Sequence, residues 1–166
     1  MEIVFNEIID SKEKMYNVDR TNPYNVAALV VHTLCNYDIG NDVIFYDMLS
    51  FLEGEYQTIS ELDKQNIKDR MIQNDKYKII GKSYFVGATP ENDYNPSIPY
   101  KVDVIENDYT DSEQGYKRLL LKSGGADSPR PITLRLAKDG NYYLWSNTYM
   151  GLLSDIRQVE SSNPWV

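Results

Sequence analysis

The stretch from Pro23 to Asn36 is apolar on almost every side of the helix that it would form. Thr21 and Asn22 provide capping residues in front of Pro23, and proline is well tolerated at the first position of a helix. A helix that is apolar around most of its circumference must be covered by other elements on several sides. The sequence therefore predicts a buried central helix, whose apolar residues are Val26, Ala27, Leu29, Val30, Val31 and Leu34.

Other helical segments surround this one in the first half of the chain. The opening residues 3–16 are predicted to form a strand and then a helical turn. Apolar residues recur at helical spacing between Asn41 and Gly54, which is a suitable end for a helix. A capping box at Thr58, with Ser60 as the competing cap, begins a third helix that extends to about Asn74.

After Asp75 the pattern changes from helical spacing to short alternating runs separated by turn residues. Strands are predicted over residues 78–86, 100–106, 116–123, 132–136 and 141–146, with Asp139 and Gly140 forming the tightest turn. The prediction is an α+β fold in one domain, residues 1–166. Its N-terminal helices, about 1–75, pack on a curved antiparallel C-terminal sheet, about 76–166.

Charge and composition exclude several classes of function. The net charge is −8 over 166 residues, which opposes binding to nucleic acid or to an anionic membrane. The single cysteine, Cys35, cannot form an internal disulfide, and no metal or cofactor motif is present, so we expect no metal and no cofactor. No export signal is recognisable, which predicts a cytoplasmic protein, although a removed signal is compatible with this sequence.

Two interpretations of His32 and Cys35 follow from their spacing on the predicted central helix. Residues three apart share a helix face, so the pair has the spacing of a thiolate–imidazole nucleophile. Both also lie inside the apolar run of that helix, where a thiol packs as a small apolar group and an imidazole bonds a nearby backbone group. The second interpretation, two core residues, is favoured.

The loop of residues 123–131 has the most unusual composition in the chain. Its glycines suit close approach of a backbone to a ligand, and Arg130 offers a planar donor for a carboxylate or phosphate. In the structural alternative Asp127 caps the turn through Ser128, and Arg130 pairs with a carboxylate to lock two strands together. The candidate binding residues here are Gly124, Gly125, Asp127, Ser128 and Arg130.

Arg135 and Trp145 complete the candidate site on the strands that follow the loop. Arg135 ends a basic run that begins at Lys117, and Trp145 ends the run Tyr142-Tyr143-Leu144-Trp145. Such a run presents aromatic rings on both faces of a sheet, so one face is core and the other is open to binding.

The tail of the chain resembles an uncharacterised bacterial family. The resemblance rests on residues 123–131, then Leu134-Arg135, Trp145, Ile156-Arg157 and the closing Pro164-Trp165, in the pattern GGADSPRP…LR…W…IR…PW. This resemblance implies a bacterial origin but does not indicate which activity the protein has. The order of elements also resembles cystatin-like and nuclear-transport-factor-like cones, in which helices cradle a curved sheet; a fold of this kind does not fix function.

Three functions remain compatible with the sequence. The preferred hypothesis is a binding or protein-interaction domain without catalytic activity, whose partner is a protein or a small molecule. The first alternative is a small enzyme with a pocket in which Asp127 is the base and Arg130 stabilises negative charge. The second is a structural subunit of an assembly, with Tyr149 and Trp165 in an exposed apolar patch.

Overall fold

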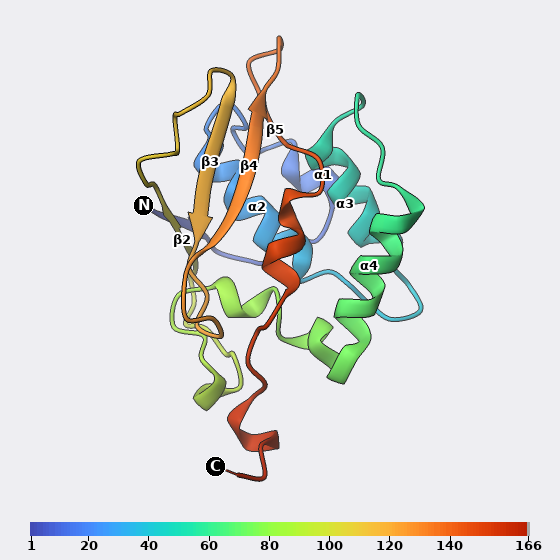
Figure 1. Ribbon diagram of the computed structural model, residues 1–166, viewed down its shortest axis with the longest axis vertical. Coiled ribbons are helices and arrows are strands. Elements are labelled where there is room, and N and C mark those ends of the chain that lie inside the picture. The colour runs from blue at the N-terminus through green and yellow to red at the C-terminus, as the bar shows by residue number, and fades with distance from the viewer. Residues whose placement is uncertain (166) are drawn as a thin grey trace.

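The computed structural model describes residues 1–165 as a curled antiparallel sheet wrapped around one helix (Figure 1). The five strands follow one another in the order of the chain: β1 (Glu2–Phe5), β2 (Tyr100–Ile105), β3 (Tyr116–Leu121), β4 (Arg130–Leu136) and β5 (Tyr142–Leu144). The sheet curls into a half-barrel. The predicted α+β fold, with helices packed on a curved antiparallel sheet, is confirmed.

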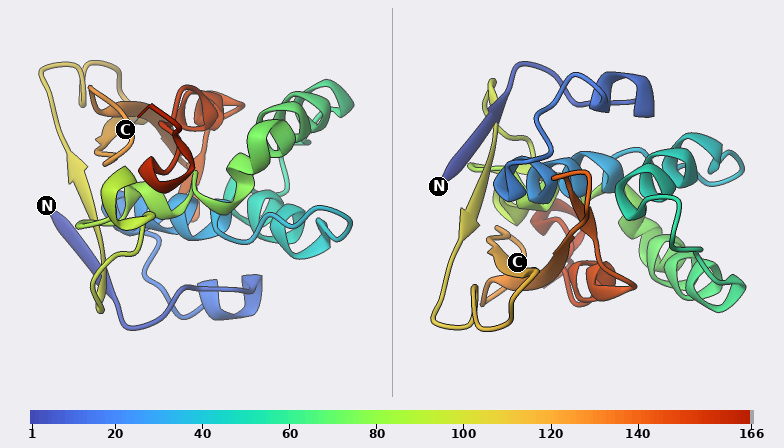
Figure 2. Two further views of the ribbon diagram at one scale, coloured as in Figure 1. Left: turned by 90° about the horizontal axis from the view of Figure 1, so that it is seen from below. Right: turned by 90° about the horizontal axis from the view of Figure 1, so that it is seen from above.

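The central helix is α2 (Pro23–Leu34), and it contacts all five strands. Pro23 is its first residue, and the Asn22 side chain caps it by accepting a hydrogen bond from the Tyr24 backbone N–H at 2.9 Å. Every residue from Val26 to Leu34 is buried. A helix without a solvated face needs a sheet that wraps around it, and Figure 2 shows α2 lying inside the curl.

The other α-helices are α1 (Lys12–Met15), α3 (Val43–Glu53) and α4 (Glu61–Ile72). In Figure 2, α3 and α4 lie on the side of α2 that is remote from β1 and β2. Phe45, Met48, Leu49 and Leu52 of α3 are buried, whereas α4 buries only Ile67 and Met71. Ser60, the competing cap predicted for α4, is the residue that caps it, accepting from the Asp63 N–H at 3.0 Å.

The strand register explains which side chains form the core. Leu119 of β3 lies opposite Ile132 of β4, and Leu134 of β4 lies opposite Leu144 of β5. All four are buried. Their alternation with polar residues turns one face of the sheet toward α2.

Two expectations about the sheet need correction. The sheet is not confined to the C-terminal half, because β1 pairs with β2 through Ile3 and Val102. The strand predicted over residues 78–86 is wrong: the chain there forms the 3-10 helices η1 (Gln73–Lys78) and η2 (Lys82–Tyr84), and only Phe85 bridges to β2. Buried residues such as Ile80 and Tyr84 are four apart there, which suits helical turns.

The remaining 3-10 helices are η3 (Pro90–Asn92), η4 (Thr148–Leu153) and η5 (Glu160–Ser162). η4 packs against β4 and α4, and so closes the side of the molecule between the sheet and the helices. Within residues 1–165, no helix has the length and apolar character that crossing a membrane requires.

Candidate functional site

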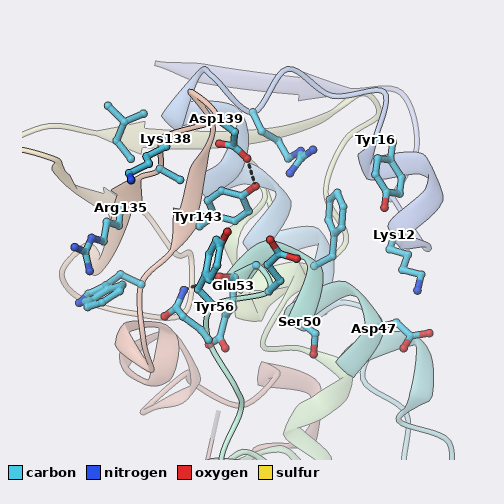
Figure 3. Close-up of a pocket in the computed structure, with 18 residues that line it drawn as sticks. Lys12, Tyr16, Asp47, Ser50, Glu53, Tyr56, Arg135, Lys138, Asp139 and Tyr143 are labelled. Carbon is cyan, nitrogen blue, oxygen red and sulfur yellow. Dashed lines mark hydrogen bonds between the residues drawn. The ribbon is translucent and has the colours of Figure 1, made fainter.

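A groove lies between the end of α3 and the β4–β5 hairpin (Figure 3). We call it the hairpin groove. Its volume is about 1280 Å³. Three segments that are far apart in the sequence line it: Lys12, Tyr16 and Arg20 from the α1 region; Asp47, Ser50, Phe51 and residues 53–57 from α3 and the following turn; and residues 135–139, Tyr143 and Trp145 from the hairpin.

Gly54 sets the course of the chain at the end of α3. Its φ of 82° is a conformation that L side chains rarely adopt, and a Cβ at this position would lie 2.8 Å from the Tyr143 ring. Glycine meets both requirements, because it accepts positive φ and leaves room for the ring. The contact brings the Tyr143 ring of β5 against the end of α3.

Gln57 ties the turn after α3 to the open edge of the sheet. Its Nε2 donates to the carbonyl oxygens of Glu53, at 2.6 Å, and Leu144, at 2.9 Å, while its Oε1 accepts from the Ser146 N–H at 2.7 Å. The Tyr142 N–H, on the same strand, donates to the Arg20 carbonyl. The backbone groups at the outer edge of β5 are therefore largely bonded within the chain.

Glu53 is a buried carboxyl group in the lining of the groove. The residue is only 5% exposed, yet it is one of the residues that line the groove (Figure 3). Burial, followed by the charge of Asp63, raises the pKa of Glu53 to about 7. Among residues 1–165, no hydrogen bond and no basic side chain offsets the charge of this carboxylate.

Two arginines of the groove are stacked on aromatic rings. The Arg20 guanidinium lies 4.5 Å from the centre of the Phe51 ring, and that of Arg135 lies 4.5 Å from the Trp145 ring. Tyr116 packs edge-on against Trp145 at 5.8 Å between ring centres. Such stacking holds the planar cations in place without neutralising them.

Asp139 and Tyr143 bond to each other at the rim of the groove. The Tyr143 hydroxyl donates to the Asp139 carboxylate at 2.6 Å, and this bond lowers the pKa of Asp139 and raises that of Tyr143. Asp139 thus stays ionised at a pH where Glu53 is part protonated.

The structure places only two of the predicted site residues in the hairpin groove. Arg135 and Trp145 line it side by side. Gly124, Gly125, Asp127, Ser128 and Arg130 lie in the loop before β4 and at the first residue of that strand, outside the groove lining.

Most polar groups of this loop bond within the chain. Arg130 donates to the carbonyl oxygens of Gly151, at 2.8 Å, and Ser154, which fixes η4 against β4. Asp127 forms an ion pair with Arg157 at 2.6 Å, and Ser128 is exposed.

The two glycines of the loop are closely packed. A Cβ on Gly124 would collide with the Ala88 carbonyl oxygen, and one on Gly125 would collide with the Tyr94 hydroxyl. The close packing agrees with a structural role for the loop, but the expected pair between Arg130 and a carboxylate is wrong, because Arg130 bonds backbone carbonyl oxygens and Asp127 pairs with Arg157. Ligand binding there stays a prediction.

His32 and Cys35 do not form an activated pair. The Nδ1 of His32 accepts a hydrogen bond from the Ile9 N–H at 2.9 Å, and burial lowers the pKa of His32 to about 4. Burial raises the pKa of the Cys35 thiol to about 12. The neutral imidazole lies in the core and the protonated thiol packs against the core, partly buried, so the favoured interpretation of the pair agrees with the structure.

Tyr149, which the assembly hypothesis placed in an exposed patch with Trp165, is buried, whereas Trp165 is 91% exposed. The two do not share a surface. In the part of the chain that the structure describes, no three His, Cys, Asp or Glu side chains gather as ligands of a metal ion.

Glu53, Arg20 and Tyr56 were not predicted from the sequence as site residues. A signal for Glu53 was present, because it is four residues after Leu49 and eight after Phe45 and so continues the apolar face of α3. A carboxyl group on the buried face of a helix is rare and points to a special role. For Arg20 and Tyr56 no local pattern exists, since their place depends on the tertiary fold.

A family model described as a domain of unknown function, DUF6935, matches residues 5–160. The chain belongs to this family. The prediction of an uncharacterised family is thereby confirmed, and the DUF6935 match includes every segment that lines the hairpin groove. Comparison with curated proteins found no match, and comparison with solved structures found none either. The description of this family assigns no activity to its members.

Proposed function

We propose that the protein is a non-catalytic binding domain whose hairpin groove takes an extended polypeptide segment of a partner protein. The size of the groove supports this proposal. Its volume of about 1280 Å³ is above the roughly 300–1,000 Å³ of ordinary small-molecule pockets. A groove of this size suits a ligand several residues long.

The charges of the groove favour a segment that carries both signs. Four basic and four acidic side chains line it: Lys12, Arg20, Arg135 and Lys138, and Asp47, Glu53, Glu55 and Asp139. The lining is balanced, although the whole protein is acidic. A polyanion such as nucleic acid gains little from such a surface, whereas a mixed polypeptide finds partners for both kinds of charge.

The observation that carries the proposal is the exposed aromatic surface in this groove. The Tyr56 side chain is 91% exposed, and the half-buried rings of Tyr143 and Trp145 line the same groove. Tyrosine and tryptophan are enriched among the residues that dominate protein–protein binding. The segment would bind through side chains, because Gln57 and Arg20 already bond the outer edge of β5.

Selection from a random peptide library on the immobilised protein tests this proposal. Peptides recovered on the wild type should lose affinity about tenfold on Tyr56→Ala, since an exposed ring can be removed without disturbing the core. Tyr109→Ala is the matched control, because Tyr109 is 70% exposed and lies outside the groove lining.

Two results would count against the proposal. One is a selection that yields no specific peptide. The other is a set of peptides that ignore Tyr56→Ala but lose affinity on Ser128→Ala, which would move the contact surface to the loop of residues 123–131.

A second candidate function is acid–base catalysis in the same groove, favoured by the protonation of Glu53 near neutral pH. The alternative with Asp127 and Arg130 as the reacting groups has less support, because both lie outside the groove lining. Mass spectrometry of recovered peptides after long incubation with the protein separates the two functions. Binding predicts unchanged peptides, and catalysis predicts a product that Glu53→Gln abolishes.

A further inference from the structure

Glu53 is a buried acid without a partner. Only 5% of its surface is exposed, and it still lines the groove. A buried carboxylate normally requires an ion pair or hydrogen bonds to offset its lost hydration. Among residues 1–165 the Glu53 carboxylate has neither. The protein thus maintains a costly group at a place that a ligand can reach.

Of the charged and titratable groups around Glu53, Asp63 increases this cost. Asp63 at the start of α4 adds negative charge, and the buried Tyr149 hydroxyl of η4 has no hydrogen-bond partner within residues 1–165. On the groove side, Tyr143 of β5 donates to Asp139, and Glu55 and Tyr56 follow in the turn. The basic side chains of the groove do not offset the Glu53 charge.

We propose that Glu53 is the specificity residue of the hairpin groove and receives the ammonium or guanidinium group of a Lys or Arg side chain of the bound segment. This inference rests on the proposed function. A cation supplies the counter-charge that the chain itself does not supply. The net charge of −8 draws basic groups toward the protein.

Proton release accompanies this recognition. Glu53 has a pKa of about 7 in the free protein, and only its ionised form pairs with a cation. A lysine side chain keeps its proton up to about pH 10. The affinity for a basic group should therefore rise about tenfold between pH 6 and pH 8, as the carboxyl group loses its proton.

Two small amides with the same four-carbon side-chain stem provide the probe and its control. Nα-acetyl-lysine methylamide is the probe, and Nα-acetyl-norleucine methylamide, which lacks the terminal ammonium group, is the control. NMR titration follows the carboxyl carbon of Glu53 as each amide is added. The lysine amide should lower the titration midpoint of Glu53 and bind about tenfold more tightly at pH 8 than at pH 6, and the norleucine amide should do neither.

Glu53→Gln keeps the size of the side chain and removes its charge. This variant should lose binding of the lysine amide and the pH dependence, with its thermal unfolding recorded to establish that it is folded. Glu91→Gln is the control, because Glu91 is an exposed acid of η3 outside the groove lining. Equal binding of the two amides, no binding of either, or the same loss in both variants would overturn the inference.

The inference and the proposed function fail in different ways. If the lysine amide binds at Glu53 but the library yields no peptide, the cation site stands and the polypeptide ligand is wrong. If peptides bind the groove without a basic residue and without pH dependence, the proposed function stands and the role of Glu53 is wrong.

Discussion

His32 and Glu53 are two buried titratable residues with opposite shifts in pKa. His32 lies between the rings of Phe5 and Phe85, at 4.6 Å and 5.2 Å between ring centres, and burial keeps it neutral down to about pH 4. Glu53 keeps its proton up to about pH 7. Both residues avoid charge inside the protein, so folding stability responds to pH in opposite directions at the two positions.

The direction in which each residue changes the folding stability with pH follows from its pKa in the unfolded chain. Unfolded histidine binds a proton below pH 6.5, so His32 costs stability as the pH falls from 6.5 to 4, by about 3 kcal/mol. Unfolded glutamate loses its proton near pH 4.5, so the contribution of Glu53 is present below that pH and is lost as the pH rises through 7. That loss is about 1–2 kcal/mol, because solvent in the groove screens the group.

Glu53→Gln separates the two effects. The variant should match the wild type near pH 4.5 and exceed its free energy of unfolding by about 1–2 kcal/mol at pH 8, since the amide is never charged. In the variant only the His32 effect remains between pH 4.5 and 6.5. Its free energy of unfolding should therefore rise more steeply with pH than that of the wild type. Urea unfolding at pH 4.5, 6.5 and 8 measures this, and parallel curves for the two proteins would refute it.

The local sequence predicted the helices and strands whose periodicity and capping residues agree with the burial of their side chains. The helix beginning at Pro23 and the strands around Val102, Leu119 and Leu134 are examples. The strand expected over residues 78–86 failed because its apolar residues pack as helical turns against the core. β1 was located, but its pairing with β2 joins segments about a hundred residues apart, which no local pattern predicts.

The end of α3 depends on Gly54. Gly54→Ala should lower the free energy of unfolding by about 2–3 kcal/mol, because the new methyl group meets both the positive φ and the Tyr143 ring at 2.8 Å. Gly140→Ala is the matched control: φ there is 85°, but nothing lies within 4 Å, so only the backbone cost of about 1 kcal/mol applies. Chemical denaturation compares the two variants. An equal loss in both would mean that the Tyr143 contact does not constrain position 54.

At the scale of the whole molecule, the hairpin groove is a product of the curled meander. It joins the α1 region, the end of α3 and the β4–β5 hairpin, which meet only because α2 lies inside the sheet and brings α3 beside β5. Arg135 and Trp145 were predicted as site residues from the basic and aromatic runs that they end. The residues of the opposite wall of the groove were not predicted. They share no motif and are brought together by tertiary packing alone.

We propose that ligands bind in the hairpin groove. A map of the backbone amide chemical shifts, recorded as the tightest peptide from the library selection is added, tests this claim. We predict changes concentrated at residues 53–57, 135–139, Tyr143 and Trp145. Changes concentrated in the loop of residues 123–131, with the groove unaffected, would contradict the claim.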